Sequence, residues 1–167
     1  MGDREGAWRA WIEGLAPALG LLARQWTDSH ADAEDVVQEA LMRFWRSGRH
    51  RARDPKAYLF ACVRRAALDL KRSTRRRQHR ERAAGQAPSS EAMFDTAPER
   101  NEWRAAVESA ISTLSIEQRE VLVMKTWGDL TFDQIGRVLD IPRRTAASRY
   151  RYALGNLRGK LKGGYAP

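Results

Sequence analysis

Residues 131–162 have the sequence TFDQIGRVLDIPRRTAASRYRYALGNLRGKLK, and the first part of this stretch predicts a short helix. Thr131 can cap the helix start, and Gln134, three residues later, completes the capping-box pattern. Ile135, Val138 and Leu139 recur at helical spacing and predict one apolar face.

A break and a second helix follow. A residue before proline is disfavoured in the α region, so Asp140 and Ile141 are expected to end the first helix. Pro142 suits the first position of the next helix, because it has no N–H to leave unpaired there. The side of this second helix expected to be buried carries Ala146, Tyr150, Leu154, Leu157 and Leu161. The opposite side carries Arg144, Ser148, Arg151, Tyr152 and Gly155.

Two short helices joined by a tight turn, with a basic and polar second helix, are typical of the helix-turn-helix that reads a DNA major groove. The alternative is an ordinary helical hairpin with a solvated second helix. Residues 143–162 contain seven Lys or Arg and no acid. Because a merely solvated face usually mixes both signs of charge, we favour DNA reading.

The whole chain is also basic, with a net charge of +9 over 167 residues and a pI near 10.4. This charge points to a polyanionic partner, most simply nucleic acid. Membrane insertion is not expected, because no apolar run approaches the length of a transmembrane helix. The single cysteine, Cys62, allows no intrachain disulfide and fits a cytoplasmic location. No zinc-ligand spacing, nucleophile elbow or phosphate-cradling loop is present, so we expect neither a cofactor nor enzyme activity.

The N-terminal part predicts two helices before the basic region. The first spans residues 8–26 and is expected to be interrupted by Gly14 and Pro17. The second spans residues 32–45, with Asp32 as its cap. Its inward face is expected to carry Val37, Leu41 and Phe44, with Val36 and Ala40 beside them. A polar and acidic ridge points outward and consists of Asp35, Gln38, Glu39 and Met42. This ridge contrasts with the basic remainder, although a solvated face would look the same.

A third helix is expected to begin at Asp54-Pro55, with a buried stripe of Leu59, Val63, Ala66 and Leu70. Residues 46–82 contain fourteen Lys or Arg against three acids, a net charge of +11 that exceeds that of the whole chain. The basic charge is therefore concentrated in this region and in the last helix. Tyr58 and Phe60 could form an aromatic platform for unstacked bases, or they could be buried core.

Residues 83–100 are rich in small residues, proline and acids, and predict a linker. Helix is expected to resume at Asn101, with Val107, Ala110, Ile111 and Leu114 packing inward. Ser115 is then expected to cap a helix that ends near Gly128. The expected fold is all-α, with two small helical domains at residues 1–82 and 101–167.

Several segments, in this order, resemble the extracytoplasmic-function sigma factors of bacterial RNA polymerase, and the resemblance covers nearly the whole chain. The segment DAEDVVQEALMRFW, residues 32–45, is similar to the polymerase-binding helix of the family's region two. AYLFACVRRAALDL, residues 57–70, with the arginines that follow, is similar to the segment that opens and reads the minus-ten element. LSIEQREVL, residues 114–122, together with residues 131–161, is similar to region four, which reads the minus-thirty-five element.

The resemblance implies a protein that binds core polymerase and directs it to promoters, with an anti-sigma factor as a further partner. The outward ridge would contact the clamp helices of the largest polymerase subunit. The implied minus-ten residues are Tyr58, Arg64, Arg65, Asp69, Arg72, Arg75, Arg76 and Arg77. The implied minus-thirty-five residues are Arg143, Arg144, Thr145, Ser148, Arg149, Arg151 and Tyr152. The competing interpretations are a helix-turn-helix regulator without a sigma role and a nonspecific RNA-binding protein.

Two positions depart from the family's pattern. Arg65 occupies the place of an asparagine in the Arg-Asn-x-Ala-x-Asp motif, and a guanidinium does not read a base edge as an amide does. Ala147 occupies the place of a basic residue in the recognition helix. Readout there is expected to depend on Arg144, Ser148, Arg151 and Tyr152.

Overall fold

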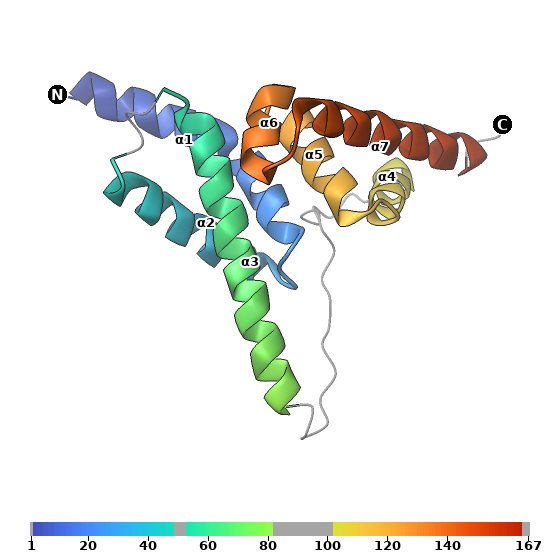
Figure 1. The fold of residues 1–167 in the computed structure, drawn as a ribbon, viewed down its shortest axis with the longest axis horizontal. Coiled ribbons are helices and arrows are strands. Elements are labelled where there is room, and N and C mark those ends of the chain that lie inside the picture. Colours follow the sequence, from blue (N-terminus) through green and yellow to red (C-terminus); the bar gives the residue numbers. More distant parts are fainter. Residues whose placement is uncertain (1, 49–52, 82–101, 165–167) are drawn as a thin grey trace. The chain divides into compact units, whose positions relative to one another are not determined.

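A computed structural model describes residues 2–48, 53–81 and 102–164, and over these residues every regular element is an α-helix (Figure 1). The chain divides into two compact units, Met1–Glu91 and Ala92–Pro167. The predicted all-α fold with two small helical domains is confirmed. The predicted linker, residues 83–100, the end of the first domain at Arg82 and the helix start at Asn101 lie outside the described residues.

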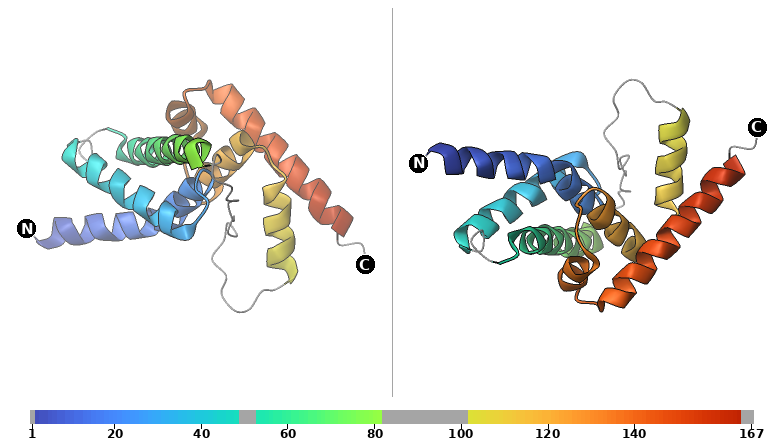
Figure 2. Two further views of the ribbon diagram at one scale, coloured as in Figure 1. Left: turned by 90° about the horizontal axis from the view of Figure 1, so that it is seen from below. Right: turned by 90° about the horizontal axis from the view of Figure 1, so that it is seen from above.

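The first unit contains α1 (Gly2–Arg24), α2 (His30–Arg46) and α3 (Pro55–Glu81), each of which contacts the other two (Figure 2). Its core is drawn from all three helices, so none of them could bury its apolar face alone. The largest fully buried side chains are Leu19, Leu22, Phe44, Leu59, Phe60 and Val63.

The predicted interruption of the first helix is wrong, because α1 continues through both Gly14 and Pro17. A proline inside a helix removes one backbone hydrogen bond and bends the helix. Figure 1 shows α1 changing direction along its length. Pro17 itself is exposed, whereas Leu15 and Leu19 on either side of it are buried. Packing on both sides of the proline therefore holds the bent helix together.

The second helix begins earlier than predicted. Its cap is Ser29, whose Oγ accepts a hydrogen bond from the Asp32 backbone N–H at 3.1 Å, so Asp32 lies in the first turn. The inward stripe is also rotated by one position from the prediction. Val36 and Ala40 are buried, whereas Val37 and Leu41 are only partly covered. Phe44 is buried as expected.

The third helix begins as predicted, with the Asp54 carboxylate accepting a hydrogen bond from the Ala57 N–H at 3.2 Å. Leu59, Val63 and Ala66 are buried, and Leu70 is partly buried. The helix then continues through the arginine-rich run to Glu81. The basic side chains of this run are therefore displayed on a helix, at helical spacing.

The second unit contains α4 (Glu102–Ser112), α5 (Ile116–Thr126), α6 (Phe132–Leu139) and α7 (Arg143–Gly164). The long helix α7 contacts each of the other three (Figure 2). One core cluster consists of Ile111, Leu114, Leu122 and Ala153, with Val107, Tyr150 and Leu157 packed against it. The predicted burial of Leu154 is wrong, because its neighbour Ala153 occupies the buried position and Leu154 is exposed. Close approach of α4 and α5 to α7 favours the smaller side chain at that position.

Two capping boxes fix the starts of α5 and α6; the one at Thr131 was predicted from its spacing, whereas Ser115 was predicted only as a cap. Ser115 and Gln118 exchange hydrogen bonds at the start of α5. Thr131 and Gln134 do the same at the start of α6, with distances of 2.8 and 3.2 Å. Each pair satisfies backbone N–H groups that the first turn of a helix leaves unpaired.

Candidate nucleic-acid and protein interfaces

The turn between α6 and α7 sets the position of α7. Asp140 adopts the left-handed conformation, with φ of 54°, and its N–H bonds to the Gly136 carbonyl. The Ile141 N–H also bonds to that carbonyl, at 2.9 Å. A Cβ atom on Gly136 would lie 2.7 Å from the Ile141 carbonyl oxygen, so only glycine allows this close approach. Helix α7 begins at Arg143, one residue later than predicted, and the Pro142 carbonyl accepts its first hydrogen bonds.

The predicted outward face of α7 is exposed at its centre. Arg144, Arg151 and Tyr152 are exposed, and spacings of three, four and seven residues place Arg144, Ser148 and Arg151 on one side of the helix. The Ser148 hydroxyl donates to the Arg144 carbonyl at 3.0 Å. The Arg151 guanidinium lies 5.6 Å from the centre of the Tyr152 ring, within the range of a cation–π contact. This face combines positive charge with hydrogen-bond donors.

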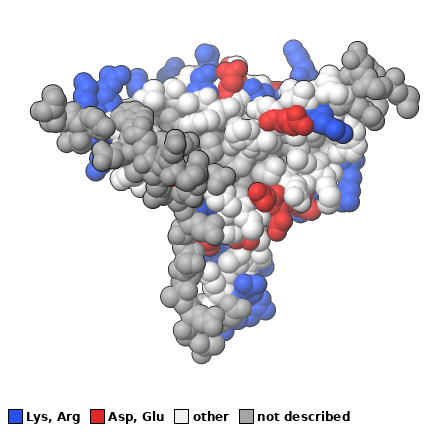
Figure 3. Space-filling model, turned by 180° about the vertical axis from the view of Figure 1, so that it is seen from behind, with Lys and Arg blue, Asp and Glu red and all other residues white. Residues whose placement is uncertain are grey.

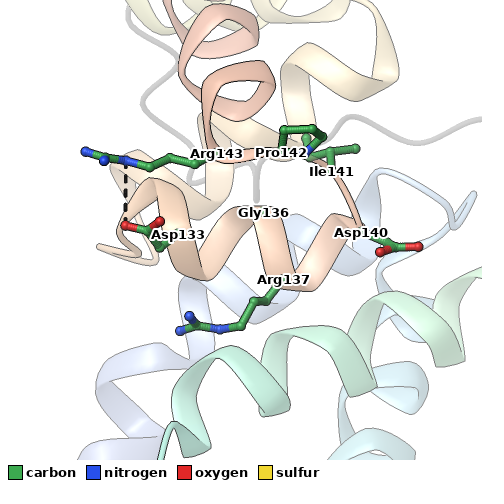
Figure 4. A pocket seen from close by; sticks show the side chains of 7 residues that line it. All are labelled: Asp133, Gly136, Arg137, Asp140, Ile141, Pro142 and Arg143. Carbon is green, nitrogen blue, oxygen red and sulfur yellow. Dashed lines mark ion pairs between the residues drawn. The ribbon is translucent and has the colours of Figure 1, made fainter.

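The other predicted residues of α7 lie at the edges of this face. Arg143 extends toward Asp133 of α6, with Nε 3.6 Å from the carboxylate (Figure 4). The pKa of Glu117 on α5 is lowered by hydrogen bonds from its own backbone N–H and the Ser115 hydroxyl, and further by the charges of Arg149 and Arg119. Thr145 and Arg149 are partly buried. An acid of the same unit thus faces Arg143.

An open pocket of about 430 Å³ lies beside the turn, between α6 and the start of α7 (Figure 4). Arg143 and Asp133 point toward one another there, whereas Arg137 and Asp140 point in other directions. Its charged lining contains two acids and two arginines. We therefore regard the pocket as part of the helix-turn-helix surface and not as a separate ligand site.

Helix α3 displays a row of polar side chains at spacings of seven, four, three and four residues, which places them on one face. The row consists of Tyr58, Arg65, Asp69, Arg72 and Arg76. Arg75 and Arg77 are exposed beside it. Figure 3 shows Lys and Arg side chains gathered over the C-terminal end of α3, at the lower tip of the view. The structure thus brings most of the predicted minus-ten residues together.

Arg64 differs from the other members of the predicted set. Its guanidinium lies 5.9 Å from the centre of the Trp26 ring, and the Lys71 ammonium lies 5.5 Å from the same ring. Both cations therefore lie on a side of α3 that faces the segment after α1. The sequence offered no signal for this contact, because Trp26 and Lys71 are far apart along the chain.

The predicted aromatic platform is only partly possible. Phe60 is fully buried in the core, so it cannot stack on a base. Tyr58 is partly buried, its ring centre 5.9 Å from that of Phe44, and its hydroxyl hydrogen-bonds to Cys62. Burial raises the pKa of the Cys62 thiol, while this hydrogen bond and the charges of Arg43 and Arg65 oppose the shift.

The ridge on α2 is displayed as predicted. Asp35, Gln38 and Met42 are exposed, and Glu39 is partly exposed. Glu39 accepts a hydrogen bond from Arg43 Nε at 2.7 Å. Two exposed residues at the end of α2, Arg43 and Trp45, were not among the predicted site residues. The spacing of four between Glu39 and Arg43 is a signal that sequence reasoning had available.

Neither a metal site nor a membrane-spanning helix occurs within residues 2–48, 53–81 and 102–164. No group of His, Cys, Asp and Glu side chains in these ranges is arranged to hold a metal ion. None of the helices in the same ranges is long and apolar enough to cross a bilayer. The described residues display two basic faces, on α3 and α7, and one ridge of acidic and uncharged side chains, on α2.

Comparison with known families identifies both units. Residues 11–77 match Sigma-70 region 2, and residues 110–159 match Sigma-70 region 4. Together these matches define a sigma factor, the class of protein that directs RNA polymerase to promoters. The chain belongs to the extracytoplasmic-function (ECF) group of these factors, as its resemblance to that family predicted.

The relatives and solved structures agree with this assignment. The ECF RNA polymerase sigma factor SigL of Mycobacterium tuberculosis is 32% identical over 162 residues, which cover 92% of this chain and 88% of SigL. The RNA polymerase sigma-E factor of Streptomyces coelicolor is 29% identical over 147 residues, covering 86% and 80%. The sigma factor RpoE of Bartonella quintana, solved in complex with the anti-sigma factor NepR, has the same fold, with a TM-score of 0.71 and 22% identity over 93% of this chain and 97% of RpoE.

Proposed function

We propose that three surfaces divide the work of this sigma factor. The ridge of α2, formed by Asp35, Gln38, Glu39 and Met42, binds core RNA polymerase. The basic face of α3 holds the displaced single strand at the minus-ten element. The outward face of α7 reads duplex DNA at the minus-thirty-five element. The proposed domain limits are residues 1–82 and 101–167, joined by residues 83–100, and the protein acts in the cytoplasm by binding, not by catalysis.

One observation carries this division: an exposed ridge with two acids lies on α2, whereas the exposed faces of α3 and α7 are basic. DNA phosphates repel carboxylates, so an exposed ridge with Asp35 and Glu39 disfavours DNA as its partner. Docking on a protein surface explains them. The match to region 2 also disfavours a helix-turn-helix regulator without a sigma role, because such a regulator would have no function for the first unit.

The residues proposed for α3 suit single-strand binding. Arg72, Arg75, Arg76 and Arg77 supply positive charge along an exposed helix, as a groove that tracks a nucleic-acid backbone requires. Arg64, Arg65, Asp69 and Tyr58 complete the proposed set. Because Phe60 is buried, stacking on this face would depend on Tyr58 alone among the two aromatic residues considered.

The residues proposed for α7 fall into two groups. Arg144, Ser148, Arg151 and Tyr152 occupy the centre of the exposed face and are proposed to contact base edges. Arg143, Thr145 and Arg149 lie at its edges and are proposed to contact phosphates. Asp133, opposite Arg143, would orient the guanidinium group of Arg143.

An anti-sigma factor is proposed as a further partner. The support is that RpoE, which shares this fold, was solved in complex with the anti-sigma factor NepR. An anti-sigma factor that covers the α2 ridge would prevent the docking proposed here.

The docking role of the ridge is tested with the double variant Asp35→Arg and Gln38→Ala. Both side chains are exposed, so we expect normal thermal unfolding but a loss of at least tenfold in affinity for core polymerase, because reversing a charge at a docked surface costs ~1.4 kcal/mol or more. The control is Glu13→Arg, which reverses an exposed acid on α1 of the same unit. Normal core binding by the double variant would show that the ridge is only a solvated face.

A further inference from the structure

Arg43 lies between the α2 ridge and the basic face of α3. Its Nε donates to Glu39 Oε1 at 2.7 Å, and its Nη1 lies 4.0 Å from Oδ2 of Asp69 on α3. Arg72 Nη1 lies 3.6 Å from the other oxygen of Asp69. These contacts connect four side chains of alternating charge, in the order Glu39, Arg43, Asp69 and Arg72. One guanidinium is therefore shared by two surfaces that the proposed function assigns to different partners.

Asp69 is the acid in the row of polar side chains on α3. Arg65, Arg72 and Arg76 lie on the same helix face, at spacings of three, four and seven residues from it. A carboxylate in that position repels the phosphates that the arginines attract, and it also competes with phosphate for Arg72. A second cation beside Asp69 would reduce both effects.

The stability of the fold does not require this arrangement. The side chains of Arg43 and Asp69 are 50% and 48% exposed, and that of Arg72 is 70% exposed. Ion pairs this exposed contribute little to folding, because water and salt screen them. The position of Arg43 beside the Asp69 carboxylate on α3 is better explained by an effect on the binding of nucleic acid to α3.

We propose that Arg43 is a positioning residue for the nucleic-acid face of α3. It shares the Asp69 carboxylate with Arg72 and offsets the charge of Asp69, so that this carboxylate competes less with phosphate for Arg72. Glu39 in turn fixes the Arg43 guanidinium through the 2.7 Å hydrogen bond. This role rests on the proposed function, in which the α3 face binds a single strand, and Arg43 acts through Asp69 without touching the strand.

The test measures binding of the full-length protein, assembled with core polymerase, to a fluorescein-labelled oligothymidylate of about twenty nucleotides, longer than the site of one single-strand-binding fold. The variants are Arg43→Ala, Asp69→Asn and the two combined. The matched control is Arg46→Ala, which removes the same charge from an exposed position one turn further along α2. Arg43→Lys, which keeps the charge but loses the guanidinium fork, is the second variant should Arg43→Ala fold poorly.

We expect Arg43→Ala to weaken binding about two- to fivefold, the range of an exposed ion pair, and more than Arg46→Ala does. Arg43→Lys should give a smaller loss. In the Asp69→Asn background, Arg43→Ala should cost no more than Arg46→Ala, because the carboxylate on which Arg43 acts has been neutralised. The dependence of affinity on salt should keep its slope in Arg43→Ala, since no phosphate contact is lost.

Two results would overturn the proposal. One is an equal loss of oligothymidylate affinity from Arg43→Ala in the wild-type and the Asp69→Asn backgrounds. The other is a salt dependence of affinity whose slope falls by about one in Arg43→Ala. Either result would make Arg43 a direct phosphate contact. Failure of the proposed function looks different. If replacing Arg75, Arg76 and Arg77 with Ala leaves oligothymidylate affinity unchanged, the α3 face does not bind the strand, and the positioning role fails with it.

Discussion

At the scale of single residues, the exposed cations of α7 separate by their surroundings. Arg144 and Arg151 lie at the centre of the exposed face, whereas Arg143 lies 3.6 Å from the Asp133 carboxylate and Arg149 is partly buried. A side chain that an acid of its own unit holds to one side suits a fixed phosphate contact. A central side chain is free to enter the major groove, where guanidinium groups distinguish guanine from other bases.

This difference predicts distinct outcomes for Arg144→Ala or Arg151→Ala and for Lys160→Ala. Loss of a base-reading arginine should reduce discrimination between promoter and scrambled duplex by ~1–3 kcal/mol. Lys160, exposed near the end of α7, should weaken both duplexes alike and lower the salt slope by about one. Titration of both duplexes with the holoenzyme at several salt concentrations measures this. Sequence-independent losses for all three variants would remove the base-reading roles.

At the scale of helices, much of the fold could be predicted because its signals are local. The capping boxes at Ser115 and Thr131 form because both partners of each box lie within four residues. Burial that depends on packing against a neighbouring helix is predicted less accurately from the sequence. Ala153 is buried in place of Leu154 because α7 packs closely against other helices. Phe60 is fully buried and Tyr58 only partly, a difference that depends on how α3 packs in the core. The start of α2 was misplaced because Ser29 and Asp32 are both good caps.

The candidate site shows the same division. The exposure of Asp35, Gln38 and Met42 follows from helical periodicity and was predicted. The contact of Arg43 with Asp69 joins two helices, so no spacing along the chain reveals it. The contact of Lys71 with Trp26 is another of this kind. Sequence therefore predicted which residues are displayed, but not which side chains from different helices share a partner.

The turn between α6 and α7 gives a prediction about stability. Gly136→Ala should destabilise the protein by about 1–3 kcal/mol, because its Cβ would press on the Ile141 carbonyl oxygen, a backbone atom that cannot move aside easily. The control is Gly159→Ala on α7, where a Cβ meets nothing within 4 Å and should add about 0.5–1 kcal/mol of stability. Urea unfolding of both variants checks this; a stable Gly136→Ala would mean that the turn relaxes at little cost.

At the scale of the whole molecule, the distribution of positive charge is consistent with two separate DNA contacts, one on α3 and one on α7. Residues 46–82 carry a net charge of +11, and residues 143–162 carry seven cations without an acid. In the proposed function, these two segments contact different elements of one promoter, so both contacts would form on the same DNA. A second contact within one molecule gains from the high effective concentration that the first contact creates. Under this proposal, the α7 face would hold duplex while the α3 face captures a strand that is open only briefly.

The most direct test of this division is permanganate reactivity of thymines near the start site, compared at equal promoter occupancy. The promoter is first obtained by mapping start sites made by core polymerase and this protein on a genomic library. One variant replaces Arg75, Arg76 and Arg77 with Ala, and its control replaces Arg158, Lys160 and Lys162, which removes the same charge from α7. We predict lower thymine reactivity for the α3 variant only, with the control affecting occupancy alone. Wild-type reactivity of the α3 variant at equal occupancy would contradict a role for this helix in holding the open strand.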